Sequence, residues 1–219
     1  MFDILYKKYK NIEKCFINYR KLTTTDKFLN KEEFLKTIQI EQYVKHEFYK
    51  KNKKILMYLF SENSKYLETT AQFRKLLNAI NENPVDAIFI TKNPLSIYIN
   101  KSIISYSNIN PFNYLHRLFS IDISTGPLCS KHTILTNSEL KDLCSEGLII
   151  HPLSLPSIPI SDPQNIWIGG ELGEVIKIES VSENTGKVIR YRIVSPDSGK
   201  INNIQKLRKS IIKNEEKVV

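Results

Sequence analysis

Residues 162–178 read DPQNIWIGGELGEVIKI, and the glycines in the middle of this stretch allow two opposite interpretations. A phosphate-binding loop has its glycines after a strand and before a helix, so that N–H groups of the helix point at the anion. Here the glycines precede EVIKIES (174–180), an alternating β-branched run that predicts a strand, and no Gly-Lys-Ser/Thr follows. The glycines therefore predict bends between elements of a β-rich domain. Asp162-Pro163 is expected to begin a turn, Gly169-Gly170 to allow a tight bend, and Trp167 to pack beneath the strand.

The residues around this stretch predict a small mixed α/β domain. GEVIKIES (173–180) and VIRYRIV (188–194) are alternating runs, and the Asn-Thr-Gly between them is a hairpin signal. A helix is expected from about 138 to 146, introduced by Thr136 and stopped by a glycine. Prolines crowd into residues 152–163, where the chain must be extended or turning.

The first part of the chain has the element order of an α/β domain. It begins with an amphipathic helix over 2–20 and a helix over about 31–38 capped by Asn30. A single buried strand is predicted from Phe48 to Phe60, ending in ILMYLF (55–60). A helix from Thr69 or Thr70 to Ile80, a buried strand over 87–91 and strand candidates at 97–104 and 119–124 follow. The strand–helix–strand order with short links predicts a βαβ unit. After Gly126-Pro127 the sequence changes in character, because a proline-rich segment and two alternating β-branched runs follow. This change places a domain boundary near 126–130.

Charge is concentrated in the first half of the chain. The net charge is +9, and residues 1–100 hold 18 Lys or Arg against 11 Asp or Glu. This excess is compatible with a polyanion nearby, although lysine-rich helix faces are more often simply solvated. The sequence contains no apolar run of about 18 residues, the length that would predict a membrane-spanning helix. The N-terminus lacks a signal-peptide core, and the three cysteines make no even disulfide framework, so an intracellular protein is expected.

No catalytic residues, metal site or cofactor site is predicted. Cys129, His132, Cys144 and His151 form a loose Cys2His2 pattern, but its second half is too open for a structural zinc site. The sequence has no pair of acids and a lysine at the spacing of a metal-dependent nuclease site. None of its histidines is accompanied by the motif of a serine or cysteine nucleophile. Tyrosines interleaved with lysines in 6–20 could bind single-stranded nucleic acid. Their three-to-four spacing favours core packing instead.

The last third of the chain carries motifs in a fixed order. They are KHTILTNSELKDL (131–143), LPSIPISDP (155–163), GGELGEVIKI (169–178) and SVSENTGKVIRYRIV (180–194). Together they resemble the fifth common subunit of eukaryotic nuclear RNA polymerases, whose C-terminal half matches a small subunit of the archaeal polymerases. The matching positions are His132, Leu135, Thr136, Glu139, Leu155, Pro156, Ile158, Asp162, Pro163, Gly173, Val175, Lys177, Ile178, Ser182, Gly186, Tyr191 and Arg192.

The resemblance implies a non-catalytic subunit of a multisubunit DNA-directed RNA polymerase, with no cofactor. Its partners would be the largest subunit, other polymerase subunits and downstream DNA bound without sequence preference, and no membrane. The protein would act wherever its polymerase does: in the nucleus if cellular, or in the cytoplasm or virion if it comes from a cytoplasmic DNA virus. The residues expected to shape the docking surface are His132, Pro156, Ile158, Asp162, Pro163, Gly173, Gly186, Tyr191 and Arg192.

The resemblance also implies the domain plan. Residues 1–128 would form a jaw domain with a truncated restriction-endonuclease-like α/β fold, and 129–195 the assembly domain. In 196–219, beyond the usual end of the family, apolar residues spaced three or four apart predict an extra helix. The loop expected to face DNA comprises Lys92, Asn93, Pro94 and Ser96, and it departs from the Thr-Pro-Ser-Ala-like family pattern. The alternative is a free-standing nucleic-acid-binding or processing protein on a nuclease-like scaffold.

Overall fold

The computed structural model describes residues 2–50, 53–80, 85–123, 129–182 and 186–197. The chain forms two compact units, Met1–Asp122 and Ile123–Val219. The predicted domain boundary at 128/129 adjoins residues outside the described ranges, and the predicted tail helix lies outside them, so both remain predictions. None of the described helices is long and apolar enough to cross a membrane.

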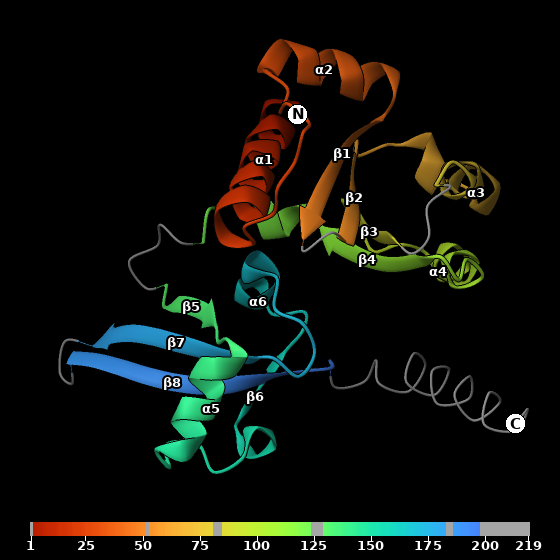
Figure 1. Cartoon of the computed structure of the whole chain (residues 1–219). Helices are drawn as coiled ribbons and strands as arrows, with labels where there is room; N and C mark the ends of the chain where they lie inside the picture. The colour runs from red at the N-terminus through yellow and green to blue at the C-terminus, as the bar shows by residue number, and fades with distance from the viewer. Residues whose placement is uncertain (1, 51–52, 81–84, 124–128, 183–185, 198–219) are drawn as a thin grey trace, which may run out of the picture. The chain divides into compact units, whose positions relative to one another are not determined.

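The N-terminal unit is a mixed four-stranded sheet with helices on both faces (Figure 1). The sheet order is β1-β2-β3-β4; β1 is antiparallel to β2, whereas β2, β3 and β4 are parallel. The elements are α1 (Phe2–Lys14) with a π-helical turn (Cys15–Tyr19), α2 (Lys31–Ile40), β1 (Tyr43–Lys50), β2 (Lys53–Phe60), α3 (Thr70–Asn78), β3 (Val85–Thr91), α4 (Ile97–Ile104), β4 (Ile109–Leu115) and a 3-10 turn (His116–Phe119). The predicted βαβ unit is confirmed as β2-α3-β3.

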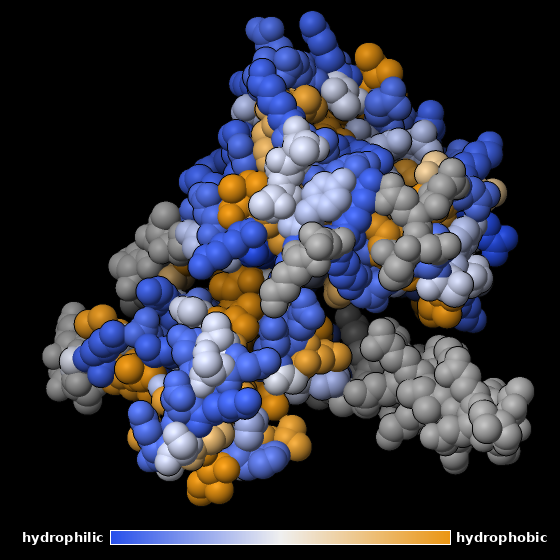
Figure 2. Space-filling model, viewed as in Figure 1, coloured by the Kyte–Doolittle hydropathy of each residue, from blue (hydrophilic) through white to orange (hydrophobic). Residues whose placement is uncertain are grey.

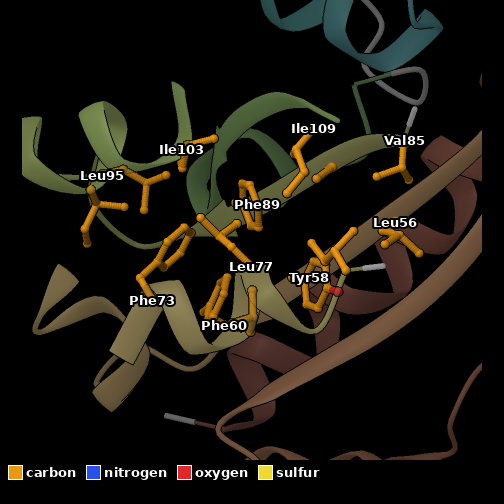
Figure 3. Close-up of a cluster of buried hydrophobic side chains, with 14 residues drawn as sticks. Leu56, Tyr58, Phe60, Phe73, Leu77, Val85, Phe89, Leu95, Ile103 and Ile109 are labelled. Carbon is orange, nitrogen blue, oxygen red and sulfur yellow. The ribbon is translucent and has the colours of Figure 1, made fainter. Parts of the chain in front are cut away.

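The apolar run of β2 is buried at six successive positions because helices cover both faces of the sheet. On one face, alternate residues of β2 and β3 pack against α3 and α4 in a cluster that includes Tyr58, Phe73, Phe89 and Ile103 (Figure 3). The opposite face meets α1 and the π-helical turn that follows it, where the Phe16 ring lies 4.9 Å from that of Phe48 on β1.

The predicted helix starts are confirmed by their hydrogen bonds. The Asn30 side chain accepts from Glu33 N at 2.9 Å, and the Glu33 carboxylate accepts from Asn30 N at 3.0 Å, which completes a capping box. Thr69 caps α3 by accepting from Gln72 N. Each cap satisfies backbone donors that the first turn of a helix leaves without partners.

Two predicted strands of the N-terminal unit are wrong. Residues 97–104 form α4, because Ser96 caps its start and Ile99 and Ile103, four residues apart, are buried against the sheet. Residues 119–124 contain no strand in their described part; the strand of this region is β4, which pairs with β3. The sequence did not predict β4 because Pro111 and two asparagines interrupt its apolar pattern, and a proline is tolerated on an edge strand.

The C-terminal unit is a second four-stranded sheet, with order β5-β7-β8-β6. Its elements are β5 (Lys131–Ile134), α5 (Asn137–Ser145), a 3-10 turn (Pro152–Ser154), β6 (Ser157–Pro159), α6 (Pro163–Ile168), β7 (Val175–Ser182) and β8 (Gly186–Ser195). The predicted hairpin is confirmed as β7–β8, and the predicted helix as α5 with Thr136 as its cap. Mixed α/β structure is therefore present in both units.

The stretch 162–178 contains a helix that the sequence interpretation missed. Asp162 does not begin a simple turn: its carboxylate accepts from Gln164 N at 2.9 Å and caps α6, with Pro163 at the first helical position. Gly169 ends α6 in the left-handed region, at φ 71°. Trp167 is buried, as expected, and it lies on this helix.

Gly170 allows the chain to pass over the buried Asn165. The side-chain amide of Asn165 donates to Ile160 O at 3.2 Å, and the backbone carbonyl of Asn165 accepts from Gly170 N at 3.2 Å. A Cβ at residue 170 would lie 2.0 Å from Asn165 Oδ1. We therefore expect Gly170→Ala to destabilise the C-terminal unit by about 1–3 kcal/mol, the usual cost of overpacking.

The single tryptophan provides the measurement, because Trp167 lies in this unit. Urea unfolding followed by its fluorescence should show a lower midpoint for Gly170→Ala. Leu172→Ala, at a neighbouring exposed position, is the control and should leave the midpoint unchanged. Equal midpoints for Gly170→Ala and the unaltered chain would contradict the close approach.

Candidate docking and nucleic-acid surfaces

The residues predicted to shape a docking surface belong mostly to the framework of the C-terminal unit. Ile158 on β6 is buried in a small core with Ile176, Ile178 and Val194. Asp162 and Pro163 start α6, as described above. Gly173 and Gly186 have φ of 86° and 69°, and Gly186 begins β8. These residues set the shape of the unit, whereas Pro156 is exposed on the segment before β6.

His132, Tyr191 and Arg192 occupy defined positions in the second sheet. His132 pairs with Ile178 across β5 and β7, and its Nδ1 lies 2.9 Å from Ser130 O. Tyr191 and Arg192 alternate along β8 and so point to opposite faces. Arg192 Nη1 donates to Ser157 O at 3.0 Å, which ties β8 to β6.

Three exposed apolar side chains of the C-terminal unit lie elsewhere, in the segment after α5. Leu148, Ile150 and Leu153 are 65%, 92% and 76% exposed. We call these three residues the apolar loop. Figure 2 shows hydrophobic residues at the surface in this part of the unit. A signal for them exists in the sequence, because residues 147–161 contain no Lys, Arg, Asp or Glu in a chain that is 25% charged.

The predicted DNA-facing loop connects β3 to α4. Pro94 is exposed, and Asn93 O accepts from the Thr91 hydroxyl at 2.7 Å. Ser96 is the cap of α4. Lys92 Nζ lies 2.7 Å from the Glu62 carboxylate, which lowers the pKa of that carboxyl and neutralises part of the lysine charge.

A buried histidine lies where the parallel strands end. His116 follows β4, and burial together with the nearby Lys8 ammonium lowers its pKa to about 4. Glu62 and the backbone of Ile90 offset this shift only in part. The imidazole is therefore neutral near pH 7.

Protonation of His116 is expected to weaken the N-terminal unit. Because the folded pKa lies below the unfolded value of about 6.5, the unfolded chain binds the proton first as pH falls. Stability should thus decrease by up to about 3 kcal/mol between pH 6.5 and pH 4 and level off below. Urea unfolding followed by far-UV circular dichroism should show a smaller decrease for His116→Gln, whereas His151→Gln, at an exposed position, should behave as the unaltered chain. An identical pH dependence in all three would contradict this role.

No group of three His, Cys, Asp or Glu side chains within the described ranges is arranged to hold a metal ion. Cys129, His132, Cys144 and His151 are therefore not brought together as a ligand set. The glycines of 169–173 lead into β7 and not into a helix, so the geometry of a phosphate loop is absent there.

The comparisons with known proteins agree with the motif order in the last third of the chain. The family described as RNA polymerase Rpb5, C-terminal domain, matches residues 121–194. Subunit Rpo5 of the DNA-directed RNA polymerase of Sulfolobus acidocaldarius is 45% identical over 74 residues, which cover 34% of this chain and 87% of the archaeal protein.

Similarity over most of the chain is found with viral proteins. The DNA-directed RNA polymerase RPB5 homolog of African swine fever virus (strain Badajoz 1971 Vero-adapted) is 26% identical over 196 residues, 82% of this chain and 92% of the viral protein. The RPB5 homolog of African swine fever virus isolate Pig/Kenya/KEN-50/1950 is 29% identical over 188 residues, which cover 80% of this chain and 91% of the viral protein. The resemblance inferred from the motifs is thus confirmed, and the chain belongs to the Rpb5 and Rpo5 family of DNA-directed RNA polymerase subunits.

Proposed function

We propose that this subunit is non-catalytic and docks on the largest subunit of its polymerase through the C-terminal unit. The observation that carries the proposal is the apolar loop, because Leu148, Ile150 and Leu153 project into solvent. Apolar residues gathered on a surface mark a protein interface, and obligate interfaces are the most apolar. The residues predicted from the family motifs would hold the unit in the shape that presents this loop.

The N-terminal unit is proposed to be the jaw, a truncated restriction-endonuclease-like domain near downstream DNA. The excess of positive charge in residues 1–100 supports this proposal, because phosphate contacts by lysine and arginine require no base readout. The viral relatives support the proposal that the subunit belongs to the polymerase of a large DNA virus. It would act in the cytoplasm or virion, wherever that polymerase acts.

Affinity purification of the tagged full-length chain tests the assembly. Very large polymerase subunits should be recovered at equal stoichiometry and should remain bound in high salt, since burial of apolar surface is not screened. Recovery of the chain alone would overturn the docking proposal.

Lys92 provides a test of the DNA contact. In the purified polymerase, Lys92→Gln should reduce the slope of log K against log salt by about one unit and weaken binding to all sequences alike. Glu62→Gln is the matched control: it removes the carboxylate that pairs with Lys92, so DNA binding should be retained or strengthened. An unchanged slope in Lys92→Gln would exclude Lys92 from the contact.

A further inference from the structure

Helix α4 carries apolar residues on both its inner and its outer face. Ile99 and Ile103 are buried against the sheet, while Ile97, Tyr98 and Ile104 are 71%, 76% and 56% exposed. At 3.6 residues per turn, the three exposed residues and Lys101 lie on the side of α4 away from the core. A helix that is apolar all round is normally covered all round.

The outer face of α4 cannot be hidden by rotation of the helix. Its inner residues belong to the main core cluster, in which Figure 3 shows Ile103 beside Phe89. Arg74 Nε on α3 donates to the buried Ser102 hydroxyl at 3.0 Å, and the Tyr106 hydroxyl after α4 donates to Asn78 Oδ1 at 2.5 Å. These bonds tie α4 to α3, so exposure of the outer residues is a fixed property of the unit.

All formal charges on α3 and α4 are positive. They are Arg74 and Lys75 on α3 and Lys101 on α4, each of them exposed, and neither helix contains Asp or Glu. Within the described ranges, no carboxylate forms an ion pair with Lys75 or Lys101. The nearest acidic residue before α3 is Glu68, in the turn that precedes its cap.

We propose that Arg74, Lys75, Ile97, Tyr98, Lys101 and Ile104, here called the α4 surface, dock a protein segment in which carboxylates flank apolar side chains. Two of the six residues, Ile97 and Ile104, are aliphatic and offer no aromatic ring on which a nucleic-acid base could stack. A protein segment covers them and gains from burial, while its carboxylates complement the three cations. Tyr98 and Arg74 are of the residue types that anchor such interfaces. This surface lies in the N-terminal unit and is independent of the apolar loop.

Photo-crosslinking in the assembled polymerase tests the proposal. Tyr98 is replaced by p-benzoylphenylalanine in the tagged full-length chain, and crosslinked peptides are identified by mass spectrometry. The same substitution at Lys36, an exposed residue of α2, is the control for non-specific reaction. We expect position 98 to crosslink to one protein segment that contains both Asp or Glu and large apolar residues, above the level at position 36.

Charge reversal then separates docking from chance proximity. Lys75→Glu with Lys101→Glu should reduce the crosslink about tenfold, equivalent to roughly 1.4 kcal/mol of binding, without lowering the thermal midpoint of the chain. Replacing the acids of the identified segment by lysine should restore it. The proposal is overturned by a crosslink to DNA, RNA or a basic segment, by a yield no higher than at position 36, or by a yield that charge reversal leaves unchanged. None of these results depends on whether the C-terminal unit is the assembly domain.

Discussion

Leu148, Ile150 and Leu153, changed together to serine, are expected to release the subunit from its polymerase while its own fold persists. Each side chain is largely exposed in the isolated chain, so its replacement removes little packing within the unit. If the partner buries them, each contributes about 1.5–3 kcal/mol to binding. The triple variant should therefore lose roughly 4 kcal/mol or more, about a thousandfold in Kd.

The measurement is co-purification of the large polymerase subunits with the tagged variant, beside Trp167 fluorescence during urea unfolding. Ile4, Ile40 and Ile121, also changed together to serine, form a matched control, because they are exposed apolar residues of the N-terminal unit. The control variant should co-purify with the polymerase. Normal co-purification of the apolar-loop variant would show that docking uses another surface, whereas a lowered unfolding midpoint would show that the loop supports the fold.

Phe89→Ala is expected to have the largest effect on stability, a loss of about 3–5 kcal/mol from the N-terminal unit. Phe89 is fully buried on β3, and its ring lies 5.2 Å from that of Phe73 on α3 and 5.7 Å from that of Tyr58 on β2. Removing it opens a cavity that the strands, held on both sides by hydrogen bonds, cannot close.

Amide hydrogen exchange of β2 and β3 provides the measurement, because it reports opening of this sheet without assuming that both units unfold together. Phe112→Ala is the control: Phe112 is a half-buried phenylalanine on the edge strand β4 and should cost less than half as much. A change below about 1 kcal/mol in Phe89→Ala lies under the usual range for such substitutions and would contradict the prediction that the core cannot close the gap.

The parts of the fold that could be predicted from sequence were those with a local physical signal. The capping residues Asn30, Thr69 and Thr136 mark helix starts through their own hydrogen bonds, and the β7–β8 hairpin is marked by its turn. The buried strands β2 and β3 were predicted from uninterrupted apolar runs. In each case the determining contacts lie within a few residues of each other along the chain.

The errors occurred where distant contacts decide the structure. IYINKSII (97–104) has β-branched residues on all sides and was predicted as a strand, but packing of Ile99 and Ile103 on the sheet makes it a helix. The apolar residues on its outer face, which caused the error, belong to the α4 surface. β1 was not separated from β2 because lysines and a glutamate interrupt it, and only its pairing with β2 gives it strand form.

The candidate site was predicted only in part. The family motifs identified residues that shape the C-terminal unit, such as Ile158 and Asp162, because caps and core positions recur within a fold. They did not identify Leu148, Ile150 and Leu153, whose exposure depends on how the segment after α5 crosses the surface. The charge-free run of 147–161 was present in the sequence, but no local rule distinguishes an exposed apolar run from a buried one.

Each unit is a continuous piece of the chain with its own sheet, and this has a consequence for biosynthesis. Domains generally fold one at a time, N-terminal first, as the ribosome releases them. The N-terminal sheet can close once β4 has emerged, before any strand of the second sheet is made. The apolar loop then emerges attached to a folded N-terminal unit. If it docks as proposed, it is a potential aggregation site only until the partner subunit covers it. Co-expression with an excess of that partner subunit would then raise the soluble yield of this subunit without any change in its sequence.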